Sequence, residues 1–311
     1  MPATQVIVNP ISGRGRGEQS VPAIRSTLDS LGLDYELTRT ERPWHAAELA
    51  EQAARQGCST VLAAGGDGTA NEILNGLMQA RAAGVRPLPA VSVLSVGRGN
   101  DFAFGMRFPA ELEAACRLAA GGARRAIDVG HVRGGLYPQG RYFGNGVGIG
   151  FDAVVGFEAL KMTRLHGFAS YIAAALKTIF LFPRGPQVRI EIDQETLALP
   201  ALMVSIMNGR RMGGGFMMAP EAETGDGLFD VCIARQVSQA GIVALIPRFM
   251  AGTQAGHPAV RFYRARRIRV VAEQGVLPAH ADGETLCTEG RELEIEVVPG
   301  ALEVLTAEAA S

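Results

Sequence analysis

A glycine-rich segment with one carboxylate, Gly65-Gly66-Asp67-Gly68-Thr69, is the part of this sequence best suited to chemistry. It follows an apolar run at 59–64 and precedes a helix-like run at 71–78. A strand that turns through glycines into a helix presents free backbone N–H groups, which attract phosphate together with the helix dipole. Since a carboxylate repels a bare polyphosphate, Asp67 suggests a bridging Mg²⁺. The segment therefore indicates phosphoryl transfer.

Three further segments place polar residues beside glycine. They are Asn9-Pro10-Ile11-Ser12-Gly13, Gly97-Arg98-Gly99-Asn100-Asp101-Phe102-Ala103 and Asp282-Gly283-Glu284. Taken singly, Asn100-Asp101 is typical of a helix cap, and an Asp-Gly pair is typical of a turn. A hydroxyl that attacks a phosphate benefits from a carboxylate within hydrogen-bond reach, and the third segment contains two carboxylates.

In this order, the four segments resemble those of bacterial lipid kinases of the diacylglycerol kinase catalytic-domain family, within the diacylglycerol kinase, NAD kinase and phosphofructokinase superfamily. The likeness runs from about residue 5 to about residue 305. It implies that Glu284 is the general base, with Asp282 beside it, and that Asp67 acts near the phosphates of ATP. It also implies nucleotide contacts by a larger set: Asn9, Ser12, Gly13, Thr40, Gly65, Gly66, Asp67, Gly68, Thr69, Asn71, Gly97, Arg98, Asn100 and Asp101.

Two positions depart from the pattern of that family. Arg98 stands where relatives have threonine, and its guanidinium could bond phosphates or stack on a base. Relatives place a structural Mg²⁺ in the matching acidic loop, with ligands that fall on the Glu223 carbonyl, the Asp226 side chain and the Leu228 carbonyl. Because Gly225 replaces a carboxylate, the metal affinity of this loop is open, and a solvated hairpin is the alternative.

Composition limits the classes of protein. A chain of 311 residues with 47% hydrophobic residues suits two domains. With 30 basic and 31 acidic residues, no overall field draws it to nucleic acid or to a membrane. Four scattered cysteines and the lack of a signal-peptide pattern favour the cytoplasm. The longest apolar run, 168–182, contains Lys177 and is shorter than the roughly 20 residues of a membrane span, so no transmembrane segment is expected.

Strand and helix patterns alternate in the first part of the chain. Strand-like runs lie at 5–8, 35–38, 60–63 and 90–94, with helical stretches near 18–31, 44–56 and 69–83. This alternation predicts an α/β domain with a parallel sheet, of the NAD kinase/diacylglycerol kinase type by the resemblance. Its ligand loops should gather at the carboxyl ends of the strands. We assign residues 1–126 to this nucleotide-binding domain, and the resemblance implies that a tail at 299–311 packs back on it.

The pattern changes from about residue 127. Runs that alternate apolar with charged residues predict antiparallel strands with one wet face. These runs lie at 141–143, 187–192, 202–207, 229–233, 267–271 and 293–298. We therefore expect a mainly β sandwich domain at 127–298, with a helical insertion at 158–182, and assign it to the lipid substrate.

The resemblance predicts an ATP- and Mg²⁺-dependent lipid kinase that transfers the γ-phosphoryl group to a hydroxyl of a diacylglycerol-like lipid. The lipid would be met at the membrane surface, by peripheral and reversible association of a cytoplasmic protein. Alternatives are an NAD kinase or another soluble-substrate kinase of the superfamily, and a nucleotide-binding regulator without catalysis. The sequence leaves open which lipid is used and whether the protein forms a homodimer.

Three regions could contact lipid: the apolar run at 168–182 and two clusters of side chains. Five arginines around Phe262 and Tyr263 could hold anionic headgroups, or could form a charged strand edge that prevents aggregation. They are Arg261, Arg264, Arg266, Arg267 and Arg269. Methionines surround Gly213-Gly214-Gly215 and could shape an acyl pocket or fill an ordinary core. They are Met203, Met207, Met212, Met217 and Met218.

Overall fold

The computed structural model describes residues 3–97, 99–162, 168–182 and 184–307. The chain forms two compact units. Unit 1 comprises Met1–Asp128 and Gly300–Ser311, and unit 2 comprises Val129–Pro299. Two long strands, β5 (Ala123–Gly134) and β15 (Glu292–Thr306), run from one unit into the other.

Unit 1 contains a parallel sheet in the order β2-β1-β3-β4. Val304 of β15 pairs in parallel with Val91 at the β4 edge. The strands are short, and β1 and β3 are buried along their whole length, as expected when helices cover both faces of a sheet, whereas the edge strand β2 is partly exposed. Their bounds are β1 Thr4–Val8, β2 Tyr35–Arg39, β3 Thr60–Gly65 and β4 Ala90–Ser95.

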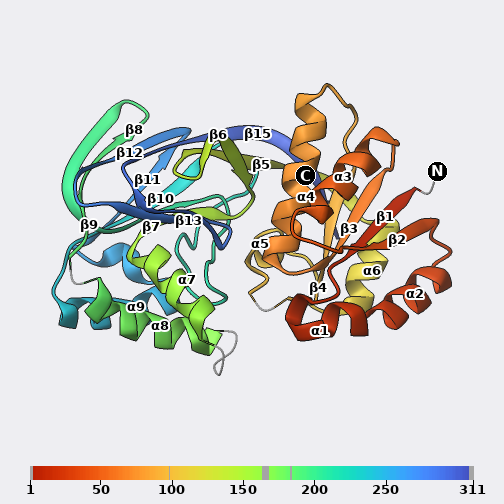
Figure 1. Cartoon of the computed structure of the whole chain (residues 1–311), viewed down its shortest axis with the longest axis horizontal. Helices are drawn as coiled ribbons and strands as arrows, with labels where there is room; N and C mark the ends of the chain where they lie inside the picture. Colours follow the sequence, from red (N-terminus) through yellow and green to blue (C-terminus); the bar gives the residue numbers. More distant parts are fainter. Residues whose placement is uncertain (1–2, 98, 163–167, 183, 308–311) are drawn as a thin grey trace. The chain divides into compact units, whose positions relative to one another are not determined.

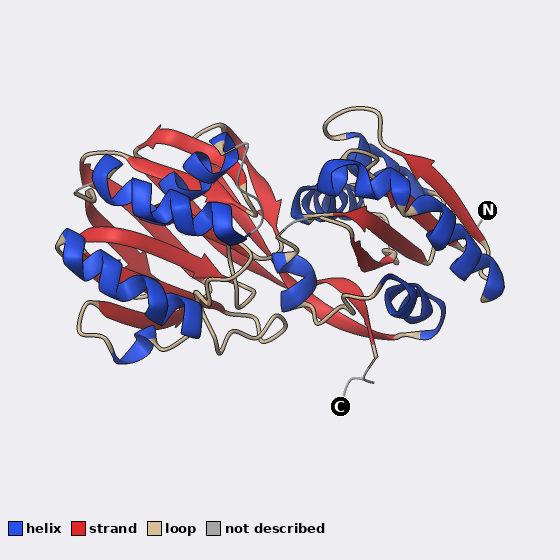
Figure 2. Ribbon diagram, turned by 90° about the horizontal axis from the view of Figure 1, so that it is seen from below, coloured by secondary structure: helices blue, strands red, loops and turns tan. Residues whose placement is uncertain are grey.

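Helices lie on both faces of this sheet (Figure 2). Helix α3 packs against α4, and α2 packs against α6. The first pair can approach closely because Gly76 of α4 has no side chain. A Cβ atom there would lie 2.0 Å from the carbonyl oxygen of Ala47 in α3. The helices are α1 Ser12–Gln19, α2 Val21–Ser30, α3 His45–Arg55, α4 Asp67–Ala82, α5 Asp101–Gly105 and α6 Leu112–Gly121. The helix expected near 18–31 corresponds to α2, and the preceding α1 contains non-helical backbone at Gly13, Arg14 and Gly15.

Unit 2 is a β sandwich, in which two antiparallel layers share strand β9 (Figure 1). The first half of β9 pairs with β8 and the second half pairs with β7 and β10. Side chains such as Ile190, Val204 and Val231 fill the core between the layers. The remaining strands are β6 Tyr137–Phe143, β7 Gly146–Gly150, β8 Gln187–Ile192, β9 Glu195–Met207, β10 Phe229–Arg235, β11 Val260–Ala265, β12 Arg267–Gln274, β13 Leu277–Ala281 and β14 Glu284–Gly290.

Three helices form a further layer on the sandwich and enclose a second core. They are α7 Phe151–Lys161, α8 Phe168–Leu181 and α9 Gln239–Ala251, and a 3-10 turn follows at Gln254–Gly256. Alternate residues of one strand face the two cores, with Met203 and Met207 toward the helices and Val204 and Ile206 toward the sandwich.

This helical layer corrects the expectation of one insertion at 158–182. The first helix already begins at Phe151, and α9 is not anticipated by the sequence pattern at all. Helix α9 is apolar on both faces, so it lacks the periodicity that reveals an amphipathic helix. Its ends carry readable signals, since Ser238 accepts a hydrogen bond from Gly241 N–H and Gly252 adopts a left-handed conformation.

Candidate functional site

The predicted phosphate loops of unit 1 meet at one edge of the parallel sheet. The side chain of Asn9, which follows β1, donates a hydrogen bond to Thr69 Oγ1 at 3.1 Å. A Cβ atom at Gly97, after β4, would lie 2.3 Å from the Cα atom of Gly66, and one at Gly13 would lie 2.1 Å from the carbonyl oxygen of Val96. The glycines are therefore required by the close contact of three loops, and they bring backbone groups together at the N-terminus of α4.

Asp67 is the first residue of α4, and its carboxylate faces the loop after β4. One oxygen accepts a hydrogen bond from the Phe102 N–H at 2.9 Å, and a Cβ atom at Gly99 would lie 2.8 Å from the other. The carboxylate thus lies beside the N–H groups that begin two helices. A negative charge is favourable there, and it could also hold a cation that bridges phosphates.

The remaining predicted nucleotide contacts lie around the same edge. Thr40 directly follows β2, and its N–H donates to the Val8 carbonyl at 2.8 Å. Ser12 begins α1, and Gly65 and Gly68 flank the turn into α4. Asn100 adopts a left-handed conformation before α5, and Asp101 is buried. Arg98 lies outside the described residues.

Asn71 differs from this group because its side chain points into the structure. It is buried in the second turn of α4 and accepts a hydrogen bond from the Asn75 side chain at 3.2 Å. This contact fixes the start of the helix from inside, so we interpret Asn71 as a residue that supports the phosphate loop.

Asp282 and Glu284 lie in unit 2, at the turn between β13 and β14. Asp282 and Gly283 both have positive φ, as in the tight turns of hairpins. The Asp282 carboxylate accepts backbone N–H bonds from Gly144, Asn145 and Gly146 at 2.8–3.0 Å. Asp282 therefore anchors the loop before β7, whereas Glu284 is exposed at the start of β14.

The acidic loop before β10 holds the predicted metal ligands. One oxygen of Asp226 accepts the Leu228 N–H at 3.0 Å, and the other is ion-paired with Arg264. Burial and the negative charges of Glu221 and Glu223 raise the pKa of Asp230 to about 6. The negative potential suits a cation, although Arg264 already provides one positive charge.

Glu223 is exposed in this loop, and Leu228 is partly buried. Within the described ranges, no group of three or more His, Cys, Asp or Glu side chains is arranged to hold a metal. The expected ligand set needs only one side chain, Asp226, together with two carbonyls. It therefore stays a prediction.

Unit 2 contains an apolar cavity of about 70 Å³ at two of the methionines that could shape an acyl pocket, and its helical and acidic lining was not anticipated. It lies between the three helices and strand β9, and one carboxylate lies in its wall. The lining residues are Phe151, Asp152, Val155, Ala175, Leu202, Met203, Phe216, Met218, Ile242, Leu245, Ile246 and Phe249. The methionines Met203 and Met218 thus face a cavity, and the other predicted methionines Met207 and Met212 belong to the same core.

Asp152 is the carboxylate in this wall. Its surroundings raise its pKa to about 7, because burial outweighs the hydrogen bond that Ser205 Oγ donates at 2.8 Å. A Cβ atom at Gly148 would lie 2.6 Å from both Asp152 Oδ2 and His280 Nε2. Burial lowers the pKa of His280 to about 4, so the ring is neutral near pH 7. The sequence signal that could have indicated this buried carboxylate is a single aspartate within the apolar run 149–155.

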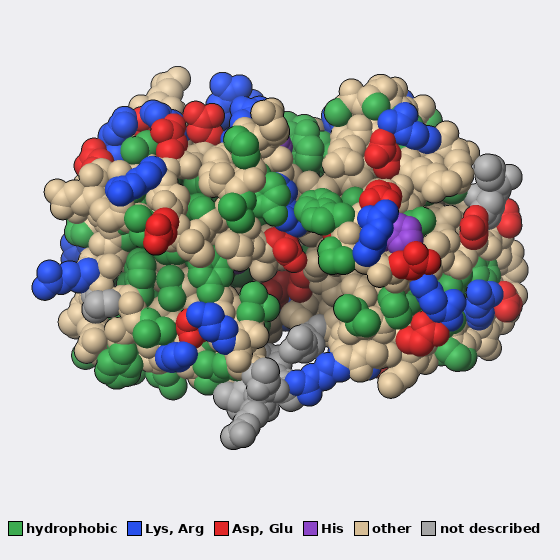
Figure 3. Space-filling model, in the orientation of Figure 1, with side chains coloured by type: hydrophobic (Ala, Val, Ile, Leu, Met, Phe, Trp, Pro, Cys, Tyr) green, Lys and Arg blue, Asp and Glu red, His purple; other side chains and the backbone are tan. Residues whose placement is uncertain are grey.

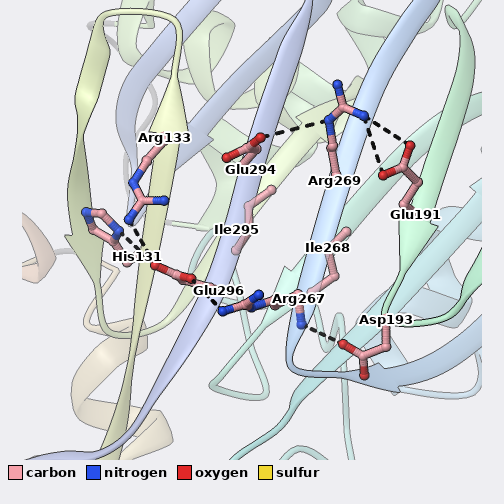
Figure 4. A pocket seen from close by; sticks show the side chains of 10 residues that line it. All are labelled: His131, Arg133, Glu191, Asp193, Arg267, Ile268, Arg269, Glu294, Ile295 and Glu296. Atoms are coloured by element: carbon pink, nitrogen blue, oxygen red, sulfur yellow. Dashed lines mark hydrogen bonds and ion pairs between the residues drawn. The ribbon is translucent and has the colours of Figure 1, made fainter.

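A second cavity, of about 370 Å³, lies on the charged face of the sandwich (Figure 4). Its arginines are paired with carboxylates. Arg269 contacts Glu292 at 2.6 Å and Glu191 at 3.1 Å, and Arg133 contacts Glu296 at 3.1 Å. These cross-strand pairs favour the interpretation of Arg267 and Arg269 as parts of a charged sheet surface.

Comparisons with known proteins cover nearly the whole chain. Residues 3–132 match the family described as "Diacylglycerol kinase catalytic domain", and residues 145–306 match the "YegS C-terminal NAD kinase beta sandwich-like domain". The "Probable lipid kinase YegS-like" of Pseudomonas aeruginosa is 30% identical, over 94% of this chain and 92% of its own. The "Diacylglycerol kinase" of Bacillus subtilis is 27% identical, over 91% of this chain and 90% of its own.

Solved structures share the fold. A diacylglycerol kinase from Bacillus anthracis aligns with a TM-score of 0.74 and 21% identity, over 98% of this chain and 96% of its own. An NAD kinase from Archaeoglobus fulgidus in complex with ATP aligns with a TM-score of 0.52 and 14% identity, over 98% of this chain and 94% of its own. The predicted α/β domain and β sandwich are thereby confirmed. With both halves matched in order, the chain belongs to the diacylglycerol kinase and YegS-like lipid kinase family of phosphotransferases.

Proposed function

We propose that this kinase uses ATP and Mg²⁺ to phosphorylate a hydroxyl of a diacylglycerol-like lipid. The observation that carries the proposal is the convergence of the loops after β1, β3 and β4 on the N-terminus of α4. Backbone N–H groups in this position suit the phosphates of a nucleotide. The phosphate loops support a nucleotide-binding role for unit 1, and the apolar cavity supports a lipid-binding role for unit 2.

The chain supplies three functions in the proposed transfer. The loop N–H groups and the start of α4 hold the phosphates, and Asp67 orients the cation that accompanies them. Mg²⁺, when bound, would neutralise part of the negative charge on the β- and γ-phosphates. Glu284 accepts the proton of the attacking hydroxyl, and Asp282 positions it by fixing the hairpin turn on which it lies. This assignment requires groups from both units to act on one lipid.

A lipid acceptor is favoured by the cavity of unit 2. Apart from Asp152, the side chains that line this cavity of about 70 Å³ are apolar, which suits a short hydrocarbon segment better than a nucleotide. An NAD kinase or another soluble-substrate kinase is the second candidate function, because an NAD kinase of known structure has the same fold as this chain. An inactive regulator is disfavoured, since Asp67 is held in place against the Phe102 N–H.

The decisive experiment offers the purified protein ATP, Mg²⁺ and a panel that contains diacylglycerol, phosphatidylglycerol, a sphingoid base, an isoprenoid alcohol and NAD. Products are separated and identified by mass spectrometry. We expect one phosphorylated lipid class and no product with Asp67→Asn. Phosphorylation of NAD alone, or no ATP-dependent product at all, would contradict the proposed function.

A further inference from the structure

Two neighbouring helices of unit 2 present apolar side chains to solvent as well as to the core. On α8, Ala174, Ala175 and Ile179 face inward, while Leu176 and Phe180 are 46% and 75% exposed. On α9, Ile242, Leu245 and Phe249 face inward, while Val243 and Met250 are 49% and 41% exposed. A helix that is apolar on all sides is normally covered by something.

These outward side chains form one surface. Helices α8 and α9 contact each other, and Figure 1 shows them on the same side of the sandwich. Their spacing places Ala173, Leu176 and Phe180 on one stripe of α8, and Val243, Pro247 and Met250 on one stripe of α9. Hydrophobic side chains gather along the corresponding lower left edge in Figure 3, with basic side chains among them. We call this surface the α8–α9 face.

The charge of the α8–α9 face is positive. Neither helix contains an aspartate or glutamate, whereas Lys177 and Arg248 are exposed on them. The nearest acid on α7, Glu158, bridges Lys161 and Lys177 at 2.6 Å, and these two lysines lower its pKa. An apolar surface on two helices that carry basic residues and, within their described bounds, no aspartate or glutamate matches the interface of an anionic bilayer.

The other candidate surfaces are less suitable. Among the arginines, Arg264 is paired with Asp226, and Arg269 is paired with Glu191 and Glu292. Most of the methionines are buried in the core behind the helices. A second copy of the chain on the α8–α9 face would bring like charges together in a symmetric contact.

We propose that the α8–α9 face docks this kinase on an anionic phospholipid bilayer, with both helices lying in the plane of the interface. The inference rests on the proposed lipid substrate and names the surface that meets it. No helix in the described part of the chain is long and apolar enough to span a bilayer. Inward residues of both helices line the apolar cavity with Asp152, so docking brings the membrane against the layer that encloses it.

The test compares vesicle binding by variants with negative charges on exposed positions. Leu176→Asp combined with Phe180→Asp places two carboxylates on the α8–α9 face without touching the cavity lining. Leu136→Asp is the matched control, because Leu136 is 67% exposed in the β5–β6 turn of the same unit. Arg248→Glu tests the charge alone. Binding is measured by sedimentation with vesicles of phosphatidylcholine, with and without phosphatidylglycerol.

We expect the double variant to bind anionic vesicles at least about tenfold more weakly, and Arg248→Glu to show a smaller loss that disappears at high salt. Leu136→Asp should bind as the parent protein does. Wild-type binding by the double variant, or an equal loss with Leu136→Asp, would overturn the proposal. A shift from dimer to monomer with vesicle binding intact would assign the face to self-association instead.

Activity separates this inference from the proposed function. The double variant should retain its turnover of a short-chain, water-soluble diacylglycerol while losing turnover on vesicles. Loss on both substrates with weakened vesicle binding and native circular dichroism would contradict a purely docking role. If the parent protein phosphorylates no lipid at all, the proposed function fails, and vesicle binding still decides the role of the face.

Discussion

The candidate site of unit 1 is formed mainly by backbone, whereas that of unit 2 is formed by side chains. In unit 1 the site is made of backbone, because glycines at 13, 66 and 97 let three loops touch. In unit 2 the cavity is made of side chains, contributed by three helices and a strand that are far apart in the sequence. A backbone site leaves a local signature of glycines, whereas a side-chain cavity leaves almost none. This difference explains why the motifs of the first site were predicted, whereas only methionines of the second were singled out as a possible acyl pocket.

The largest expected effect concerns Glu284, the residue of unit 2 that is predicted to act as the general base. Glu284→Gln keeps the shape of the side chain and removes the base, so kcat should fall by roughly 10²- to 10⁴-fold with ATP binding retained. Glu289→Gln, an exposed glutamate on the same strand, is the control and should leave kcat unchanged. Near-normal turnover of Glu284→Gln in a steady-state kinase assay would remove Glu284 from the mechanism.

The carboxyl group of Asp152, in the wall of the cavity, should make the stability of the folded protein depend on pH. Because the pKa of Asp152 is raised to about 7, the folded protein holds its proton more tightly than the unfolded chain does. Its contribution to stability therefore falls as pH rises from about 4 to 7, by on the order of 4 kcal/mol. His280, with a lowered pKa, acts in the opposite direction between about 4 and 6.5.

The measurement is urea unfolding of the parent protein and Asp152→Asn at pH 5 and at pH 8. The difference in unfolding free energy between the two proteins at each pH isolates the effect of the Asp152 carboxyl, because His280 is present in both. We expect the variant to gain stability relative to the parent at the higher pH. A difference that does not change with pH would mean that Asp152 is solvated like a surface carboxylate.

The backbone site is tested by adding one methyl group. Gly97→Ala would place its Cβ atom 2.3 Å from Gly66, so the loops must separate, which costs about 1–3 kcal/mol in stability, ATP affinity or both. Gly121→Ala is the matched control in the same unit, since no atom lies within 4 Å of its added Cβ. Calorimetry of ATP binding and thermal unfolding measure the two effects. Equal behaviour of both variants would show that the loops do not depend on close contact.

The smallest expected effect concerns the acidic loop of unit 2. If Asp226 is a Mg²⁺ ligand, millimolar Mg²⁺ should raise the Tm of the parent protein by a few degrees, and Asp226→Ala should abolish this rise. Arg264→Gln should strengthen it, because Arg264 is ion-paired with the same carboxylate. A Tm that responds identically in all three proteins would leave the loop as a hairpin without a metal.

Local patterns were sufficient for the parallel sheet. The four strands of unit 1 lie within one or two residues of the runs that predicted them. Three of them are buried and mostly apolar, as expected for strands covered on both faces, and the edge strand β2 was predicted although it is partly exposed. The helices of unit 2 were harder to predict. Helix α9 packs on a β layer and is also apolar outside, so neither its length nor its period separates it from a buried strand.

Local sequence was enough to predict the order of the phosphate-loop motifs and the parallel arrangement that brings Asn9, Gly66 and Gly97 to one edge. These depend on residues close to each other along the chain and on a general rule for parallel sheets. Tertiary structure decided that Asp282 anchors residues 144–146, that Asp152 faces an apolar cavity and that Arg264 pairs with Asp226. These properties arise from contacts between residues 38 to 138 positions apart, and a pKa depends on the surroundings that such contacts create.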